Sequence, residues 1–106
     1  MRYAYLIYQD EDTESRSELA AEQITAMGYG ACVLGDHRLR ASHAATTVRS
    51  TRGGLVVADG PFTPMCDQLS RLFVVEMRDL DDALLAAKGL ARSCVGVEIR
   101  PIWSAG

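Results

Sequence analysis

The feature that most limits the possible folds of this chain is a strand-like run that stops abruptly. Residues 55–58 are apolar and include two valines, and Asp59-Gly60-Pro61-Phe62 follows at once. Glycine permits a positive φ angle, whereas proline fixes its own φ angle and has no N–H to continue a strand ladder. An aspartate at such a place can accept hydrogen bonds from nearby backbone N–H groups. The pattern therefore predicts a β-strand that ends in a sharp turn at Asp59.

The other elements alternate along the chain without internal repeats or a linker. Residues 2–8 alternate in the manner of a central strand, Ser15-Arg16-Ser17-Glu18 has the form of a capping box that begins a first helix, and Asp79 caps a second. Further strands are expected at 31–34, 44–49, 55–58, 72–77 and 95–102, a polar turn at 35–38, and a short helical turn after Thr63-Pro64. This order predicts an α+β fold, with one antiparallel sheet and two main helices on one face.

The last predicted strand has two different faces. Val97 and Ile99 share one face, whereas Glu98, Arg100 and Ile102 share the other, because side chains alternate along a strand. Two helices can cover only one face of such a sheet. A second copy of the chain is the simplest cover for the other face, so we expect a homodimer.

Composition excludes several classes of protein. A chain of 106 residues with 48% hydrophobic and 24% charged residues fits one globular domain, spanning residues 1–106. A net charge of −3 disfavours a nucleic-acid partner, and the basic cluster Arg38, Arg40, Arg49 and Arg52 is expected to be solvated or to face a ligand. No apolar run approaches the ~20 residues of a membrane helix, so we expect no membrane partner.

The three cysteines predict neither a disulfide framework nor a zinc site, because their number is odd and no C-x-x-C spacing occurs. A metal site built from Asp36, His37 and His43 is conceivable, but their spacing selects no metal. We therefore expect a cytoplasmic protein without a cofactor or a bound metal.

Several segments occur in a fixed order that covers nearly the whole chain: 3–8, 39–49, Asp59-Gly60-Pro61-Phe62, 68–69, 73–76, 79–83 and 97–101. In this order and spacing they resemble the YCII-related family, and in particular its DGPF type. The resemblance implies a ferredoxin-like α+β fold that dimerises as a dimeric α/β barrel, and an enzymatic role that is poorly defined.

The chain also departs from that pattern. The resemblance implies a catalytic histidine in the region of the first helix, but no histidine occurs before His37. Ser70 and Arg71 stand where the DGPF type favours two glycines. A pocket at this place would therefore be narrower or would carry a different charge. These departures favour a non-catalytic protein more than the resemblance alone would.

Asp59 is the leading candidate for chemistry, because ligand-binding residues often lie where a strand ends. Its carboxylate can either stabilise its own turn through hydrogen bonds to backbone N–H groups or act on a ligand. His43 is a candidate catalytic base or a solvated surface residue. Phe62 is expected in the core.

Four further residues are candidates for ligand binding. Arg49 and Arg100 could fix a carboxylate through paired hydrogen bonds, and Arg71 would alter the charge of the pocket. Cys66 would be the third residue of the helical turn after Thr63, where the helix dipole would lower its pKa, although a cysteine there can equally be a small buried side chain.

Two functional readings remain open. One is a small dimeric enzyme that binds a polar or anionic molecule near Asp59 and catalyses proton transfer as a lyase, hydrolase or isomerase. The other is a non-catalytic ligand-binding or regulatory partner protein.

Overall fold

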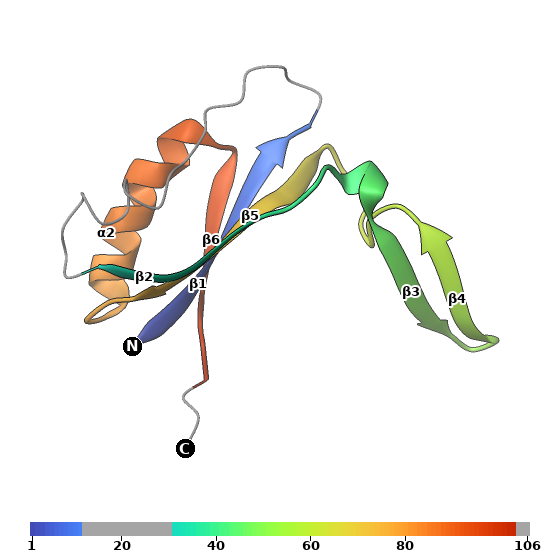
Figure 1. The fold of residues 1–106 in the computed structure, drawn as a ribbon, viewed down its shortest axis with the longest axis horizontal. Helices are drawn as coiled ribbons and strands as arrows, with labels where there is room; N and C mark the ends of the chain where they lie inside the picture. Colours follow the sequence, from blue (N-terminus) through green and yellow to red (C-terminus); the bar gives the residue numbers. More distant parts are fainter. Residues whose placement is uncertain (12–30, 104–106) are drawn as a thin grey trace.

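The computed structural model describes residues 1–11 and 31–103 (Figure 1). Its elements are β1 (Arg2–Asp10), β2 (Cys32–Arg38), the 3-10 helix η1 (Ser42–Ala44), β3 (Thr46–Thr51), β4 (Gly54–Asp59), β5 (Asp67–Glu76), α2 (Leu80–Leu90), the 3-10 helix η2 (Ala91–Ser93) and β6 (Gly96–Pro101). The strands form a four-stranded antiparallel sheet in the order β2-β5-β1-β6 and a separate two-stranded sheet, β3-β4. The predicted central position of the first strand is confirmed.

The core lies between the four-stranded sheet and α2. Tyr5 lies opposite Phe73 on β5 and Ile99 on β6, so these three side chains share the face that α2 covers. The helix contributes small side chains to this core, including Ala83 and Ala86, both fully buried. The Tyr5 hydroxyl donates a 2.6 Å hydrogen bond to the Ala83 carbonyl oxygen, which joins sheet and helix in the interior.

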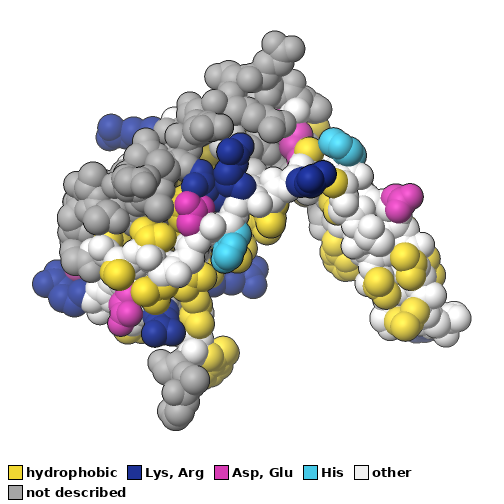
Figure 2. Space-filling model, viewed as in Figure 1, with side chains coloured by type: hydrophobic (Ala, Val, Ile, Leu, Met, Phe, Trp, Pro, Cys, Tyr) yellow, Lys and Arg dark blue, Asp and Glu magenta, His cyan; other side chains and the backbone are white. Residues whose placement is uncertain are grey.

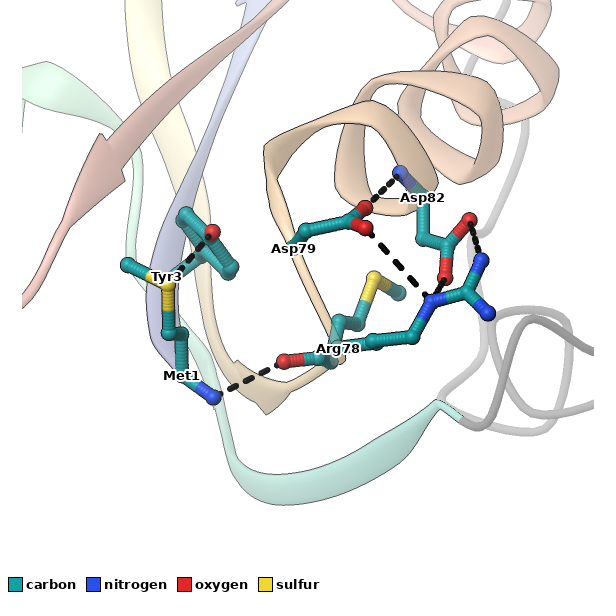
Figure 3. Close-up of polar contacts among 6 residues, drawn as sticks. Met1, Tyr3, Arg78, Asp79 and Asp82 are labelled. Carbon is teal, nitrogen blue, oxygen red and sulfur yellow. Dashed lines mark hydrogen bonds and ion pairs between the residues drawn. The ribbon is translucent and has the colours of Figure 1, made fainter.

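The start of α2 is fixed by charged side chains (Figure 3). The Asp79 carboxylate accepts a 2.9 Å hydrogen bond from the Asp82 N–H, so the predicted cap is confirmed. The Arg78 guanidinium lies 3.0 Å from the Asp82 carboxylate and 3.5 Å from that of Asp79. The Met1 amino group donates to the Met77 carbonyl oxygen at 2.9 Å, which holds the beginning of β1 beside the end of β5.

The opposite face of the sheet, which we call the open face, carries the alternate residues of the same strands. Leu6, Leu72 and Val74 lie there half-buried. Glu98 and Arg100 lie beside them, so the prediction that these two residues share one face of the last strand is confirmed. In the described part of the chain, α2 is the helix that packs on this sheet, and it lies on the other face (Figure 1).

A β-bulge interrupts the pairing of β1 with β5. Ile7 pairs with Arg71 but the next residue, Tyr8, pairs with Leu69, so Ser70 is the extra residue. The Ser70 hydroxyl donates to the Ile7 carbonyl oxygen at 3.2 Å, and its own carbonyl oxygen accepts from the Leu39 N–H at 2.9 Å. The bulge places Leu69 beside Tyr8 on the side of the open face.

Strands β3 and β4 form a hairpin that stands away from the main sheet (Figure 1), and we call residues 46–59 the arm. Their pairing runs from Thr46 opposite Asp59 to Thr51 opposite Gly54. Gly54 has a φ angle of 116°, which suits glycine at this tight turn. Every residue of β4 is exposed.

The predicted ferredoxin-like sheet with two helices on one face is wrong, and with it the dimeric α/β barrel type. The described residues are mostly β-structure, with six strands in two antiparallel sheets and a single α-helix. The two strands of the arm pair with each other across a short turn instead of joining the main sheet, whose edges are β2 and β6. The expected first helix, with its Ser15-Arg16-Ser17-Glu18 capping box, lies outside the described residues.

Two local predictions also fail. Residues 35–38 belong to β2 and are not a turn, because they pair with β5 from Val74 to Arg71. No helical turn follows Thr63-Pro64, and β5 begins already at Asp67. The Gln68 side-chain amide donates to the carbonyl oxygens of Thr63 and Met65, both at 2.7 Å, and so stabilises an irregular loop instead.

Candidate functional site

A cavity of about 710 Å³ lies where the arm joins the main sheet. Its walls come from the end of β1 and the start of β5, from the connection 39–45 between β2 and β3, and from the Pro61–Met65 loop. Most of the lining is apolar, with Leu39, Phe62 and Leu69 as the larger side chains. Volume and lining match those of sites for small organic molecules, which span roughly 300–1,000 Å³. We call it the joint cavity.

Several polar side chains of the lining serve to build the walls. The Thr47 hydroxyl donates to the Gly60 carbonyl oxygen at 2.7 Å, and the Gln68 amide holds the Pro61–Met65 loop as described above. The Ser42 N–H donates to a Glu11 carboxylate oxygen at 2.8 Å, and the Ser42 hydroxyl donates to the other oxygen. These groups fix the shape of the cavity.

Three polar side chains of the lining remain for a ligand. Tyr8, Arg40 and Asp67 line the joint cavity, and the structure gives their side chains no hydrogen bond or ion pair with another described residue. Arg40 is the one cation among the described lining residues. Because a guanidinium can donate two parallel hydrogen bonds to a carboxylate or a phosphate, Arg40 gives the cavity a place for an anionic group.

The Asp59-Gly60-Pro61-Phe62 turn forms the border between the arm and the cavity. Gly60 has a φ angle of 107°, and its N–H donates to the Ala45 carbonyl oxygen at 2.8 Å. Pro61 and Phe62 line the cavity. Within the described residues, no hydrogen bond to the Asp59 carboxylate holds this turn. The Gly60 N–H and the Thr47 hydroxyl hold it instead, each by a hydrogen bond to a backbone carbonyl oxygen.

The two predicted proton carriers lie close to the joint but outside the lining. Asp59 is the last residue of β4, opposite Thr46, and is exposed. His43 is exposed in η1, between two segments of the connection that does line the cavity. Their roles as an acid or a base stay predictions.

The three predicted ligand arginines are engaged elsewhere. The Arg49 guanidinium lies 4.1 Å from the centre of the Phe62 ring and donates to the Phe62 carbonyl oxygen at 2.9 Å. Phe62 is 61% exposed, so its predicted place in the core is wrong. Arg100 forms an ion pair with Glu98 on the open face.

Arg71 lies on the face of the sheet that α2 covers, 4.8 Å from the centre of the Phe73 ring. Its guanidinium donates two 2.7 Å hydrogen bonds to the Asp36 carboxylate, and these bonds hold the pKa of Asp36 below its usual value. None of the three arginines lines the joint cavity. Arg40 belongs to the basic cluster seen in the sequence, but nothing in that cluster separates it from its neighbours.

Cys66 is exposed in the loop before β5. The expected effect of a helix dipole on its thiol is wrong, because no helix begins at Thr63. The described residues hold no group of three histidine, cysteine or acidic side chains placed to bind a metal ion. Nor does any helix within residues 1–11 and 31–103 have the length and apolar character to cross a membrane.

Comparison with models of protein families gives no match. A protein of Rhizobium meliloti (strain 1021), described as "Uncharacterized protein R00369", is 31% identical over 114 aligned positions, which cover 96% of this chain and 92% of the relative. Neither comparison supplies the YCII-related name, which stays a prediction from the motifs.

Proposed function

The chain belongs to the same family as the Rhizobium meliloti protein, and from the cavity beside its Asp59-Gly60-Pro61-Phe62 turn we propose that it binds a small molecule there. The ligand would have an apolar body and one anionic group. The observation that carries this proposal is the presence of Arg40, without a described partner, in a cavity whose lining is otherwise largely apolar.

Both parts of the ligand follow from the lining. The side chains of Leu39, Phe62 and Leu69 offer apolar surface, which favours transfer of a hydrocarbon or aromatic body out of water. A hydrogen bond to a charged group contributes about 1.5–3 kcal/mol, so Arg40 would favour a carboxylate over a neutral group of the same size. Tyr8 and Asp67 would then select among polar substituents.

The test uses octanoate and octanol, which share an apolar chain and differ in charge. Their binding would be measured by displacement of the fluorescent probe 8-anilinonaphthalene-1-sulfonate. We expect octanoate to bind about tenfold more tightly than octanol, and Arg40→Gln to remove most of this difference.

Arg52→Gln is the matched control, because Arg52 lies at the exposed tip of the arm. Equal binding of the two compounds, or equal effects of the two substitutions, would contradict the proposal. Circular dichroism spectra of both variants would establish that the fold is kept.

A second candidate is proton-transfer catalysis of the lyase, hydrolase or isomerase type by Asp59, with His43 as its partner. It is favoured by one observation: the Asp59 carboxylate takes no part in holding its own turn, so its charge remains for a ligand. If turnover of a carboxylate substrate is found, Asp59→Asn should abolish it while leaving binding in the cavity intact. Binding without any turnover would favour the non-catalytic or regulatory reading.

We also infer a cytoplasmic location from the sequence. The three cysteines, which are free, agree with a reducing compartment. Membership of the YCII-related family, DGPF type, also remains a proposal, which rests on the order and spacing of the sequence motifs.

A further inference from the structure

The joint cavity holds one charge of each sign. Arg40 is the one cation and Asp67 the one carboxylate among its described lining residues. Neither side chain has a hydrogen bond or an ion pair with a described residue, so the two charges do not pair with each other. Glu11, beside the wall, differs, because its carboxylate accepts from the Ser42 N–H at 2.8 Å. Both charges in the cavity are therefore left for water or for a ligand.

The register of the strands brings these two residues to the same part of β5. The Leu39 N–H donates to the Ser70 carbonyl oxygen at 2.9 Å, and Arg40 is the next residue along this edge of β5. Asp67 and Leu69 both line the cavity, as alternate residues of one strand do, and two residues of an extended strand span about 7 Å. Arg40 and Asp67 thus border the same patch of cavity wall, together with Leu69.

A ligand with only a negative charge would suit half of this wall. If its anionic group bound Arg40, that group would lie near the Asp67 carboxylate, and like charges repel with an energy that falls only with the first power of the distance. A positive group on the same ligand would add an attraction and could donate hydrogen bonds to the carboxylate. The two charges of the wall therefore favour a ligand that carries both signs.

The rest of the lining defines the third part of the ligand. Leu39, Phe62 and Leu69 are the larger side chains of the lining, and all three are apolar. Figure 2 shows basic and acidic side chains where the arm joins the sheet, and hydrophobic side chains on both sides of the hollow between arm and sheet. A few charged groups within a mostly apolar lining suit a molecule with a charged head and an apolar body.

We propose that the ligand is an apolar α-amino acid: its carboxylate binds Arg40, its ammonium group binds Asp67, and its side chain lies against Leu39, Phe62 and Leu69. In such a molecule both charged groups are attached to one carbon atom, so the head reaches both charges of the wall while the side chain extends over the apolar surface. This inference rests on the proposed ligand site and names the class of molecule that the site binds.

The test compares three compounds with the same eight-carbon chain: octanoate, 2-aminooctanoate and octylamine. Isothermal titration calorimetry would measure their binding at about pH 7, where the carboxylate is ionised and the amine is protonated. We expect the wild-type chain to bind 2-aminooctanoate about tenfold more tightly than octanoate, and about tenfold more tightly than octylamine, because each of these lacks one charged hydrogen bond.

Each substitution should remove one of these two preferences. Asp67→Asn should remove most of the preference over octanoate, and Arg40→Gln most of the preference over octylamine. The matched control is Asp81→Asn, which neutralises an exposed carboxylate of α2 and should leave both preferences unchanged. Circular dichroism would establish that each variant keeps its fold.

Two results would overturn the proposal: octanoate that binds the wild-type chain as tightly as 2-aminooctanoate, or a preference over octanoate that survives Asp67→Asn. If octanoate still binds more tightly than octanol in either case, the anion site stands and only the amino-acid ligand is wrong. Equal binding of octanoate and octanol would instead contradict the proposed site, and this inference with it.

Discussion

The buried hydroxyl of Tyr5 predicts how the fold responds to alkaline pH. The side chain is 0% exposed, and burial, with a smaller effect from Tyr3, raises the pKa of Tyr5 from 10.0 to about 12. The folded chain therefore keeps this hydroxyl neutral at pH values where the unfolded chain ionises it. The resulting stabilisation is fully present below pH 10 and is lost as the pH rises toward about 12.

The size of the loss follows from the two pKa values. At about pH 11 the free energy of unfolding should have fallen by about 1.4 kcal/mol, and complete loss amounts to about 2.7 kcal/mol. Tyr5→Phe removes the ionisable group and also the 2.6 Å hydrogen bond to the Ala83 carbonyl oxygen, which costs about 1 kcal/mol at neutral pH. The variant should thus be less stable than wild type at neutral pH and equal to it near pH 11.

Urea unfolding followed by circular dichroism at a series of pH values would measure both proteins. The difference between them is the quantity of interest, because it isolates the effect of the Tyr5 hydroxyl. A difference that stays constant from neutral pH to pH 11 would refute the reasoning, since it would mean that Tyr5 ionises equally easily in the folded chain. Tyr8→Phe, at the end of the same strand, is the matched control.

Two further predictions concern aspartates at the ends of elements. Asp79→Ala should lower the free energy of unfolding by about 1 kcal/mol, because it removes the acceptor of the Asp82 N–H at the start of α2. Urea unfolding would measure this change. The control is Asp81→Ala, on the exposed side of the same turn, which should lower the free energy of unfolding less. Asp59→Asn should leave the melting temperature nearly unchanged, because Gly60 and Thr47 hold that turn. A sharp fall in the melting temperature of Asp59→Asn would show that the carboxylate stabilises the turn.

The sequence predicted those elements that local chemistry determines. The alternation in residues 2–8 and the cap at Asp79 both depend on neighbours in the chain, and the structure has a strand at the first place and the start of a helix at the second. These local signals did not determine which strands pair with one another or how many sheets they form. The arm pairs within itself, and nothing in its alternation shows whether its two strands join a larger sheet.

Side-chain contacts that simple local preferences do not include also decided the failures at the site. Thr63-Pro64 is a good helix start by local preference, but the side chain of Gln68 holds the carbonyl oxygens of that loop. Phe62 is apolar, yet it is exposed beneath the Arg49 guanidinium. Arg40 could be found only as one member of a basic cluster, because the walls of the cavity come from segments far apart in the sequence.

The extra residue at Ser70 has a consequence for how this architecture can change. In a regular strand, residues two positions apart lie on the same face. Because of the extra residue, Leu69 points into the cavity although Arg71, two positions later, faces the helix side. Loss of that one residue would rotate the beginning of β5 by half a turn and withdraw Leu69 from the wall. Relatives of this chain could therefore gain or lose this cavity through a change in length alone, with every wall residue still present in their sequences.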